Sequence, residues 1–163
     1  MKKLFYLALP ALIIVSCKNM SQKENKESEK AITPKLFYGM IGPDSVFQYS
    51  LVNNNGMLVK VLNYGGTVTD IMAPDKNGTT GDVILGYDSL QGYLQKANPY
   101  FGSLVGRYAN RIANGKFILD GRTYTLDTND HGNSLHGGFK GFDKEIWTVA
   151  DFSDSSLNLV YES

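Results

Sequence analysis

Short runs of alternating apolar and polar residues, broken by Asn-Gly and Asp-Gly pairs, constrain the fold of this chain most. Runs at 46–51 and 57–62 flank the Asn-Gly pair at 55–56, and a second set flanks the Asp-Gly pair at 120–121. Asn, Asp and Gly tolerate the positive φ that tight hairpin turns require. Both sites therefore predict β-hairpins.

Other segments extend the same pattern. Two adjacent glycines at 65–66 predict a bulge or a close backbone approach, and residues 89–97 predict one or two helical turns with Ser89 as a possible cap. Further strands are expected at 67–72, 83–87, 116–119, 123–126, 147–149 and 157–161. Many short strands with regular turns and almost no helix predict an all-β fold, a sandwich or a barrel.

The first 35 residues are expected to lie outside this fold. A basic start and an apolar stretch at 4–15, too short to span a membrane, end in Ser16-Cys17, which resembles the lipobox of bacterial lipoproteins. That resemblance implies cleavage before Cys17, its lipidation, and attachment to a membrane of the bacterial cell envelope, with the outer membrane favoured. The alternatives are an ordinary signal peptide with an incidental cysteine, or a single-span anchor.

We therefore expect a signal peptide at 1–17, a polar tether at 18–35 and the folded part at 36–163. Cys17 is the only cysteine, which leaves no basis for a disulfide framework or a thiolate metal site. The chain has 16 basic and 16 acidic residues, so its charge gives no reason to expect nucleic acid as a partner.

The most informative stretch lies between residues 100 and 147. An Asn-Arg pair, Asn110 and Arg111, follows two glycines in an apolar context, so it requires either an internal polar network or a polar ligand. His136 precedes a Gly-Gly pair, where backbone and ligand can approach closely and the imidazole can bond a hydroxyl.

These segments resemble a known family. Gly-Arg-Tyr-Ala-Asn-Arg-Ile at 106–112, Leu-His-Gly-Gly at 135–138, Gly-Phe-Asp-Lys at 141–144 and Trp147 look like the signatures of the aldose 1-epimerases. A weaker resemblance extends the match to about residues 40–163.

The resemblance implies a β-sandwich of the galactose mutarotase type, of which this chain would form the N-terminal half. It implies an isomerase that interconverts the α and β anomers of hexoses such as glucose or galactose by acid–base ring opening, without a cofactor. The family's sugar-binding Asn-Arg pair maps onto Asn110 and Arg111. Its histidine that binds the sugar near the ring oxygen and anomeric end maps onto His136.

The chain departs from the family at the groups that move protons. The family's acid is a second histidine and its base a late glutamate, and His131, Glu145 and Glu162 match neither. We therefore expect a chain truncated before its catalytic residues, with little or no activity alone. The alternatives are a non-catalytic carbohydrate-binding lipoprotein fragment and a fragment that does not fold by itself.

Each site residue also has a structural alternative. Asn110 and Arg111 could belong to a polar loop cluster and His136 to the core, while Arg107, Asp143 and Trp147 are expected to be structural. A metal site built on His131 and His136 is disfavoured by their spacing and by the glycine-rich context, so no metal is expected.

Overall fold

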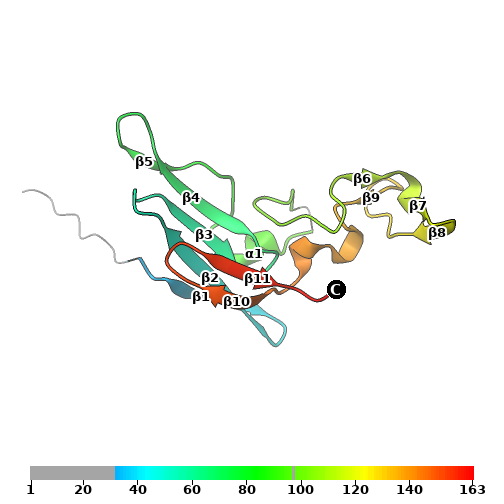
Figure 1. Cartoon of the computed structure of the whole chain (residues 1–163), viewed down its shortest axis with the longest axis horizontal. Helices are drawn as coiled ribbons and strands as arrows, with labels where there is room; N and C mark the ends of the chain where they lie inside the picture. Colours follow the sequence, from blue (N-terminus) through cyan, green and yellow to red (C-terminus); the bar gives the residue numbers. More distant parts are fainter. Residues whose placement is uncertain (1–31, 97) are drawn as a thin grey trace, which may run out of the picture. The chain divides into compact units, whose positions relative to one another are not determined.

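The computed structural model describes residues 32–96 and 98–163 (Figure 1). The predicted signal peptide, its Cys17 and residues 18–31 of the predicted tether lie outside the described residues. Across the described ranges, no helix has the length and apolar character needed to cross a membrane.

The largest unit of structure is a five-stranded antiparallel sheet in the order β1-β2-β3-β4-β5. Every strand pairs with its neighbour in sequence, so short turns suffice to connect them. The strands are β1 (Lys35–Ile41), β2 (Asp44–Val52), β3 (Leu58–Leu62), β4 (Val68–Pro74) and β5 (Thr80–Asp82).

The remaining strands form three antiparallel pairs (Figure 1). They are β6 (Arg111–Ile112) with β9 (Ser134–Leu135), β7 (Lys116–Leu119) with β8 (Arg122–Thr125), and β10 (Thr148–Phe152) with β11 (Leu157–Val160). The helical elements are α1 (Leu90–Tyr93) and the 3-10 turns η1 (Ala113–Gly115), η2 (Gly138–Lys140) and η3 (Phe142–Lys144). The predicted all-β class is confirmed.

The predicted turns form where the sequence places them. Asp120 and Gly121 both have positive φ, 51° and 72°, and join β7 to β8. Between β2 and β3, Asn53 Oδ1 accepts the backbone N–H groups of Asn55 and Met57, which fixes the other predicted hairpin turn.

The glycine pair at 65–66 forms the reversal between β3 and β4. Both residues have positive φ, 64° and 53°, and Thr67 N–H donates to Tyr64 O across the turn at 3.2 Å. A side chain on Gly65 would run into the backbone carbonyl of Asp143. The predicted close backbone approach is confirmed, and only glycine combines this conformation with this contact.

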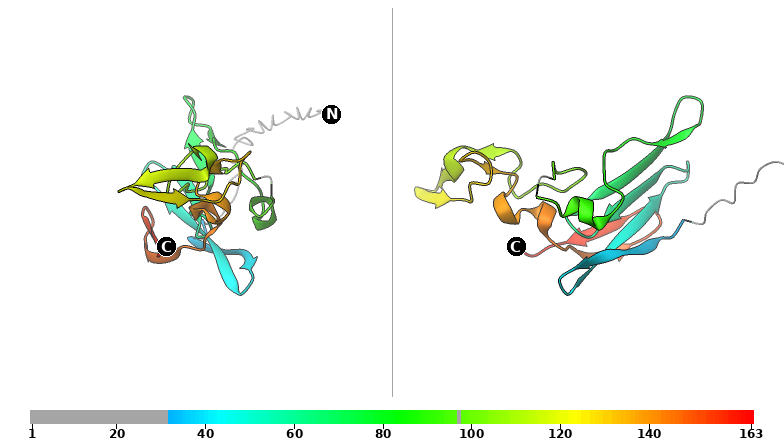
Figure 2. Two further views of the ribbon diagram at one scale, coloured as in Figure 1. Left: turned by 90° about the vertical axis from the view of Figure 1, so that its right-hand side faces the viewer. Right: turned by 180° about the vertical axis from the view of Figure 1, so that it is seen from behind.

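The apolar core lies between one face of the sheet and helix α1 (Figure 2). Val46, Leu62 and Tyr64 come from the sheet side, and Leu90 and Tyr93 from the helix. Burial of Val46 and Leu62 is complete. The predicted helical segment is therefore confirmed, with its apolar side facing the core.

Ser89 occupies the N-cap position of α1, but its side chain makes no capping hydrogen bond. The capping role suggested by the sequence is therefore wrong, and packing against the sheet stabilises this single turn instead.

The buried strand predicted at 83–87 is also wrong. Strand β5 ends at Asp82, whose carboxylate accepts the N–H of Ile84 at 3.1 Å and so turns the chain out of the ladder. Val83 and Leu85 are 68% and 69% exposed. Val83 N–H still donates to Ile71 O of β4 at 3.0 Å, but the ladder between β4 and β5 ends at Asp82, and an apolar run that pairs no further does not form a strand.

The β10–β11 hairpin packs beside the five-stranded sheet. The Phe152 ring lies 5.0 Å from the Tyr49 ring, edge to face, and Trp147 N–H donates to Asn63 O at 2.8 Å. The turn predicted at 153–156 joins the two strands as expected.

Candidate functional site

The predicted sugar-binding residues meet where β6 pairs with β9. Arg111 lies opposite Leu135 in the ladder, which places Asn110 directly across from His136. Asn110 N–H donates to His136 Nδ1 at 3.0 Å, and His136 N–H donates to Asn110 O at 3.1 Å. Two residues 26 positions apart are therefore joined by reciprocal hydrogen bonds.

The Asn110 bond decides which imidazole nitrogen of His136 carries the proton. Because Nδ1 accepts a backbone N–H, the proton of the neutral ring resides on Nε2. His136 therefore has an Nε2–H group that can donate to a ligand oxygen, while its other nitrogen is occupied within the protein.

Both residues of this pair adopt left-handed backbone conformations. Asn110 has φ of 65° and His136 of 54°. Such conformations are uncommon outside glycine and persist where surrounding contacts enforce them, often at functional sites. The reciprocal hydrogen bonds supply that enforcement here.

Arg111 is oriented by a carboxylate that the sequence did not single out. Asp130 Oδ2 accepts from Arg111 Nε at 2.6 Å, while Arg111 Nη1 lies 3.5 Å from Asn110 Oδ1. The Arg111 side chain is 54% exposed. The guanidinium is thus held through Nε, and its terminal nitrogens are presented for paired hydrogen bonds to adjacent hydroxyls.

Asp130 also binds the second histidine of the chain. His131 Nδ1 lies 2.9 Å from Asp130 Oδ1, and the His131 side chain is 95% exposed. Hydrogen bonds from His131 and then from Arg111 hold the pKa of Asp130 below its usual value. His131 therefore takes part in orienting Asp130.

Asn129 fixes the backbone on both sides of His136. Its Oδ1 accepts Leu135 N–H at 2.7 Å, and its Nδ2 donates to the carbonyl oxygens of Leu135 and Gly138 at 3.0 and 3.3 Å. Sequence reasoning missed this residue as well. Its type, an Asn in a turn-rich loop, was the only available signal.

Glycines allow the two motif segments to pack backbone against backbone. Gly137 has φ of 94°, and a side chain there would overlap the carbonyl of Gly106. A side chain at Gly106 would in turn overlap the ring of Phe142. The glycines of both motifs are thus required by this contact as well as by local conformation.

Asp143 and Trp147 have the structural roles predicted for them. Asp143 is buried and bonds Lys144 Nζ at 2.5 Å. The Trp147 indole donates to Phe142 O at 3.1 Å and packs edge to face on the Phe142 ring. Arg107 is exposed, and its guanidinium lies 5.5 Å from the centre of the same ring.

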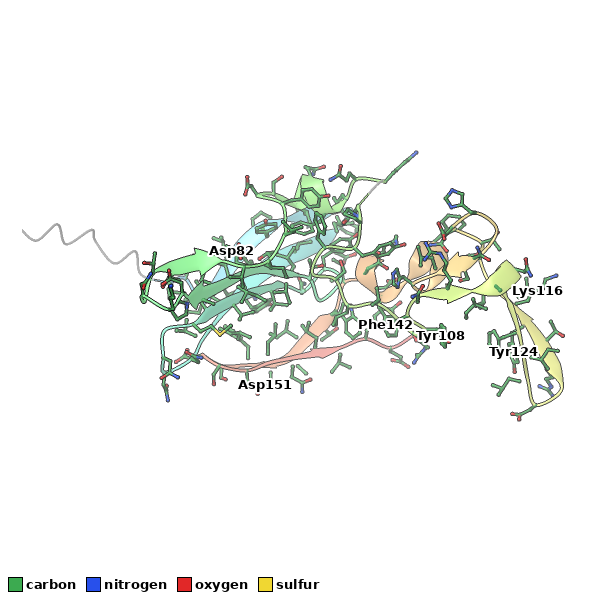
Figure 3. The ribbon with its side chains drawn as sticks, turned by 90° about the horizontal axis from the view of Figure 1, so that it is seen from above. Asp82, Tyr108, Lys116, Tyr124, Phe142 and Asp151 are labelled. Carbon is green, nitrogen blue, oxygen red and sulfur yellow. The ribbon has the colours of Figure 1, made fainter. Side chains whose placement is uncertain are left out.

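A cavity of about 870 Å³ opens beside Asn110 and Arg111. Its volume falls in the range of small-molecule sites. Tyr108 and Phe142, labelled in Figure 3, are among its lining residues, whereas His136 is not; its neighbour Gly137 is. The structure therefore brings all three predicted residues together but gives Asn110 and Arg111 the direct access to this cavity.

The chain is similar to proteins of one known family. The family model described as aldose 1-epimerase matches residues 48–163. The chain is 49% identical over 108 residues to galactose mutarotase of Bos taurus, covering 66% of this chain and 31% of that protein. It is 39% identical over 108 residues to aldose 1-epimerase of Escherichia coli strain K12, with the same two coverages.

Solved structures give the same result. A GalM/aldose epimerase homologue from C. elegans superposes with a TM-score of 0.63 at 33% identity, over 68% of this chain and 34% of that one. Galactose 1-epimerase from Lactobacillus acidophilus NCFM superposes with a TM-score of 0.61 at 31% identity, over 74% of this chain and 34% of that one. These matches support the predicted β-sandwich type, and the chain spans about a third of the length of these relatives.

Proposed function

The chain belongs to the aldose 1-epimerase family, and from this premise we propose that it takes part in interconverting the α and β anomers of a hexose such as galactose or glucose. Asn110, Arg111 and His136 are the proposed sugar ligands. The observation that carries the proposal is the reciprocal Asn110–His136 pair, which places the proton of the neutral imidazole on Nε2, together with the contact between Asn110 Oδ1 and the Arg111 guanidinium.

Each ligand suits a different part of the sugar. The terminal nitrogens of Arg111 and the amide of Asn110 can pair with adjacent hydroxyls, because a guanidinium fork and an amide offer donors at matching spacing. His136 Nε2–H can donate to the ring oxygen or the anomeric hydroxyl. The relatives named galactose mutarotase support a hexose as the ligand.

Mutarotation also needs proton transfer. A base removes the proton of the anomeric hydroxyl, an acid protonates the ring oxygen, the C1–C2 bond rotates, and the ring closes on its other face. We assign Asn110, Arg111 and His136 to binding and orienting the sugar, and we assign neither proton transfer to them.

Hexose binding tests this assignment. Titration calorimetry with millimolar galactose and glucose should give heat for the chain, and Arg111→Lys, which keeps the charge but removes the fork, should weaken binding severalfold. Arg122→Lys on the exposed hairpin β7–β8 is the matched control and should bind as the parent does. Absence of heat, or equal loss in both variants, would contradict the assignment.

Polarimetry on freshly dissolved α-galactose then distinguishes turnover from binding. Mutarotation faster than the spontaneous rate supports the enzyme. Binding without acceleration supports the second candidate, a carbohydrate-binding protein without turnover.

We further propose that the protein is lipid-anchored in a bacterial cell envelope. The support is sequence alone: the apolar stretch at 4–15 followed by Ser16-Cys17. Labelling with an alkyne fatty acid in a bacterial host should mark the chain, and Cys17→Ser should abolish the label. Retention of the label in that variant would count against the anchor.

A further inference from the structure

We propose that Tyr100 is a positioning residue for His136. Its ring holds the imidazole in the orientation that keeps Nδ1 on Asn110 and leaves Nε2–H for the ligand. The sugar-binding consequence rests on the proposed function, whereas the effect on the imidazole itself rests on geometry alone.

The two rings are in direct contact. The Tyr100 and His136 ring centres lie 4.7 Å apart at an interplanar angle of 61°, an edge-to-face arrangement that is favourable for aromatic pairs. The His136 ring torsion has broad, roughly two-fold preferences, so a single hydrogen bond from Asn110 restrains it only in part. The Tyr100 ring supplies a second restraint from a different chain segment.

Tyr100 is itself held firmly. Its φ of 63° is uncommon for a bulky residue. Its N–H donates to Asn98 Oδ1 at 3.1 Å, and its carbonyl accepts Ser103 N–H at 3.2 Å. Two residues further along, Gly102 O accepts Val68 N–H at 2.9 Å, which ties this loop to the start of β4.

A fixed cation contacts the same tyrosine. Lys144 Nζ lies 5.2 Å from the centre of the Tyr100 ring, within the range of a cation–π interaction. Lys144 is in turn bonded to the buried carboxylate of Asp143. Tyr100 therefore has Lys144 and His136 as two ring contacts, and the cation further limits its movement.

This arrangement differs from ordinary core packing. Tyr100 is half-buried and lies outside the core cluster formed by sheet and helix α1. In the described part of the chain, its aromatic contact is with His136. Its position is thus explained by the histidine it supports.

Nitrogen NMR of the imidazole tests the proposal. The chain has two histidines, so His131→Gln assigns the signals of His136. Long-range ¹⁵N–¹H spectra of the neutral ring should show the Nε2–H form in about tenfold excess, as one hydrogen bond to Nδ1 implies. A contact between Tyr100 ring protons and the imidazole should appear in the nuclear Overhauser spectrum.

Two substitutions separate ring contact from other effects. Tyr100→Leu removes the aromatic ring but adds no backbone freedom, so the excess of the Nε2–H form should fall and the galactose dissociation constant should rise by about two- to tenfold. Tyr100→Phe keeps the ring, and both readouts should match the parent chain. A merely structural tyrosine would lower the melting temperature without moving the tautomer ratio.

Two results would overturn the proposed role of Tyr100. A folded Tyr100→Leu chain with the parental tautomer ratio overturns the proposal, as does absence of the Tyr100–His136 Overhauser contact in the parent, which requires no variant to fold. If the parent binds no galactose, the proposed function fails, while the tautomer measurements still decide the role of Tyr100.

Discussion

Replacing Asn129 by alanine should destabilise the chain measurably while leaving the sheet core untouched. Asn129 makes three hydrogen bonds, one from Leu135 N–H and two to the carbonyls of Leu135 and Gly138. Each such bond is worth about 0.5–1.5 kcal/mol net, so the full loss of all three would cost about 1.5–4.5 kcal/mol. Because Asn129 is half-buried, water replaces part of the lost hydrogen bonding, and we expect the free energy of unfolding to fall by about 1.5–3 kcal/mol.

Urea unfolding followed by fluorescence provides the assay. Trp147 is the only tryptophan and packs against Phe142, close to the loop that Asn129 braces, so its emission reports on this region. Asn55→Ala is the matched control, since within residues 32–96 and 98–163 the Asn55 side chain makes no hydrogen bond. This control should change the free energy of unfolding by less than about 0.5 kcal/mol.

A third variant sharpens the test. Asn129→Asp keeps an oxygen for Leu135 N–H but places a second oxygen against two carbonyls, so at neutral pH it should destabilise at least as much as alanine does. If Asn129→Ala unfolds at the same urea concentration as Asn55→Ala, the bracing role derived from these three bonds is wrong.

Three further outcomes are expected from other parts of the molecule. Leu62→Ala, at a fully buried core position, should lower the free energy of unfolding by about 2–5 kcal/mol in the same urea assay. Burial raises the pKa of the Tyr38 hydroxyl from 10.0 to about 12, so between these two pH values the unfolded chain loses this proton and the folded chain keeps it. The free energy of unfolding should therefore be unchanged below pH 10 and fall as the pH rises toward 12. Tyr38→Phe should reduce that fall, as measured by thermal melts at a series of alkaline pH values. The pKa of Asp130 is held below 3.8 by its bonds to His131 and Arg111, so its stabilising contribution should be present above that pH and be lost as pH falls through the folded-state pKa; acid unfolding of Asp130→Asn should lack this component.

Local turn chemistry explains how much of the fold could be predicted from sequence. The hairpin turn at 120–121 requires positive φ at consecutive residues, which an Asp-Gly pair indicates in the sequence, whereas the glycines at 65–66 indicated a close backbone approach and not the reversal that they form. Alternation on either side then fixes the hairpins. The run at 83–87 carried no such local information, because whether an apolar run becomes a strand depends on a partner elsewhere in the chain.

The residues of the candidate site also differ in whether the sequence alone could identify them. Asn110, Arg111 and His136 could be named because they stand in recognisable segments, yet no periodicity in the sequence joins residues 26 positions apart. Asp130 and Tyr100 could not be found, since each acquires its importance only through a tertiary contact, with Arg111 and with His136 respectively. Neither residue type is unusual where it stands.

Core packing and site geometry are therefore carried by different interactions in this chain, although a side chain that orients the site, such as Asn129, also contributes to stability. The β6–β9 ladder joins only two residue pairs, too few to fix a site alone, so side-chain bonds from Asn129 and Asp130 and the ring of Tyr100 do most of the orienting. The core around Leu62 contributes to stability without touching these groups. Changes in the core should thus weaken folding while leaving the His136 tautomer intact, whereas loss of the Tyr100 ring should shift the tautomer at a smaller cost in stability.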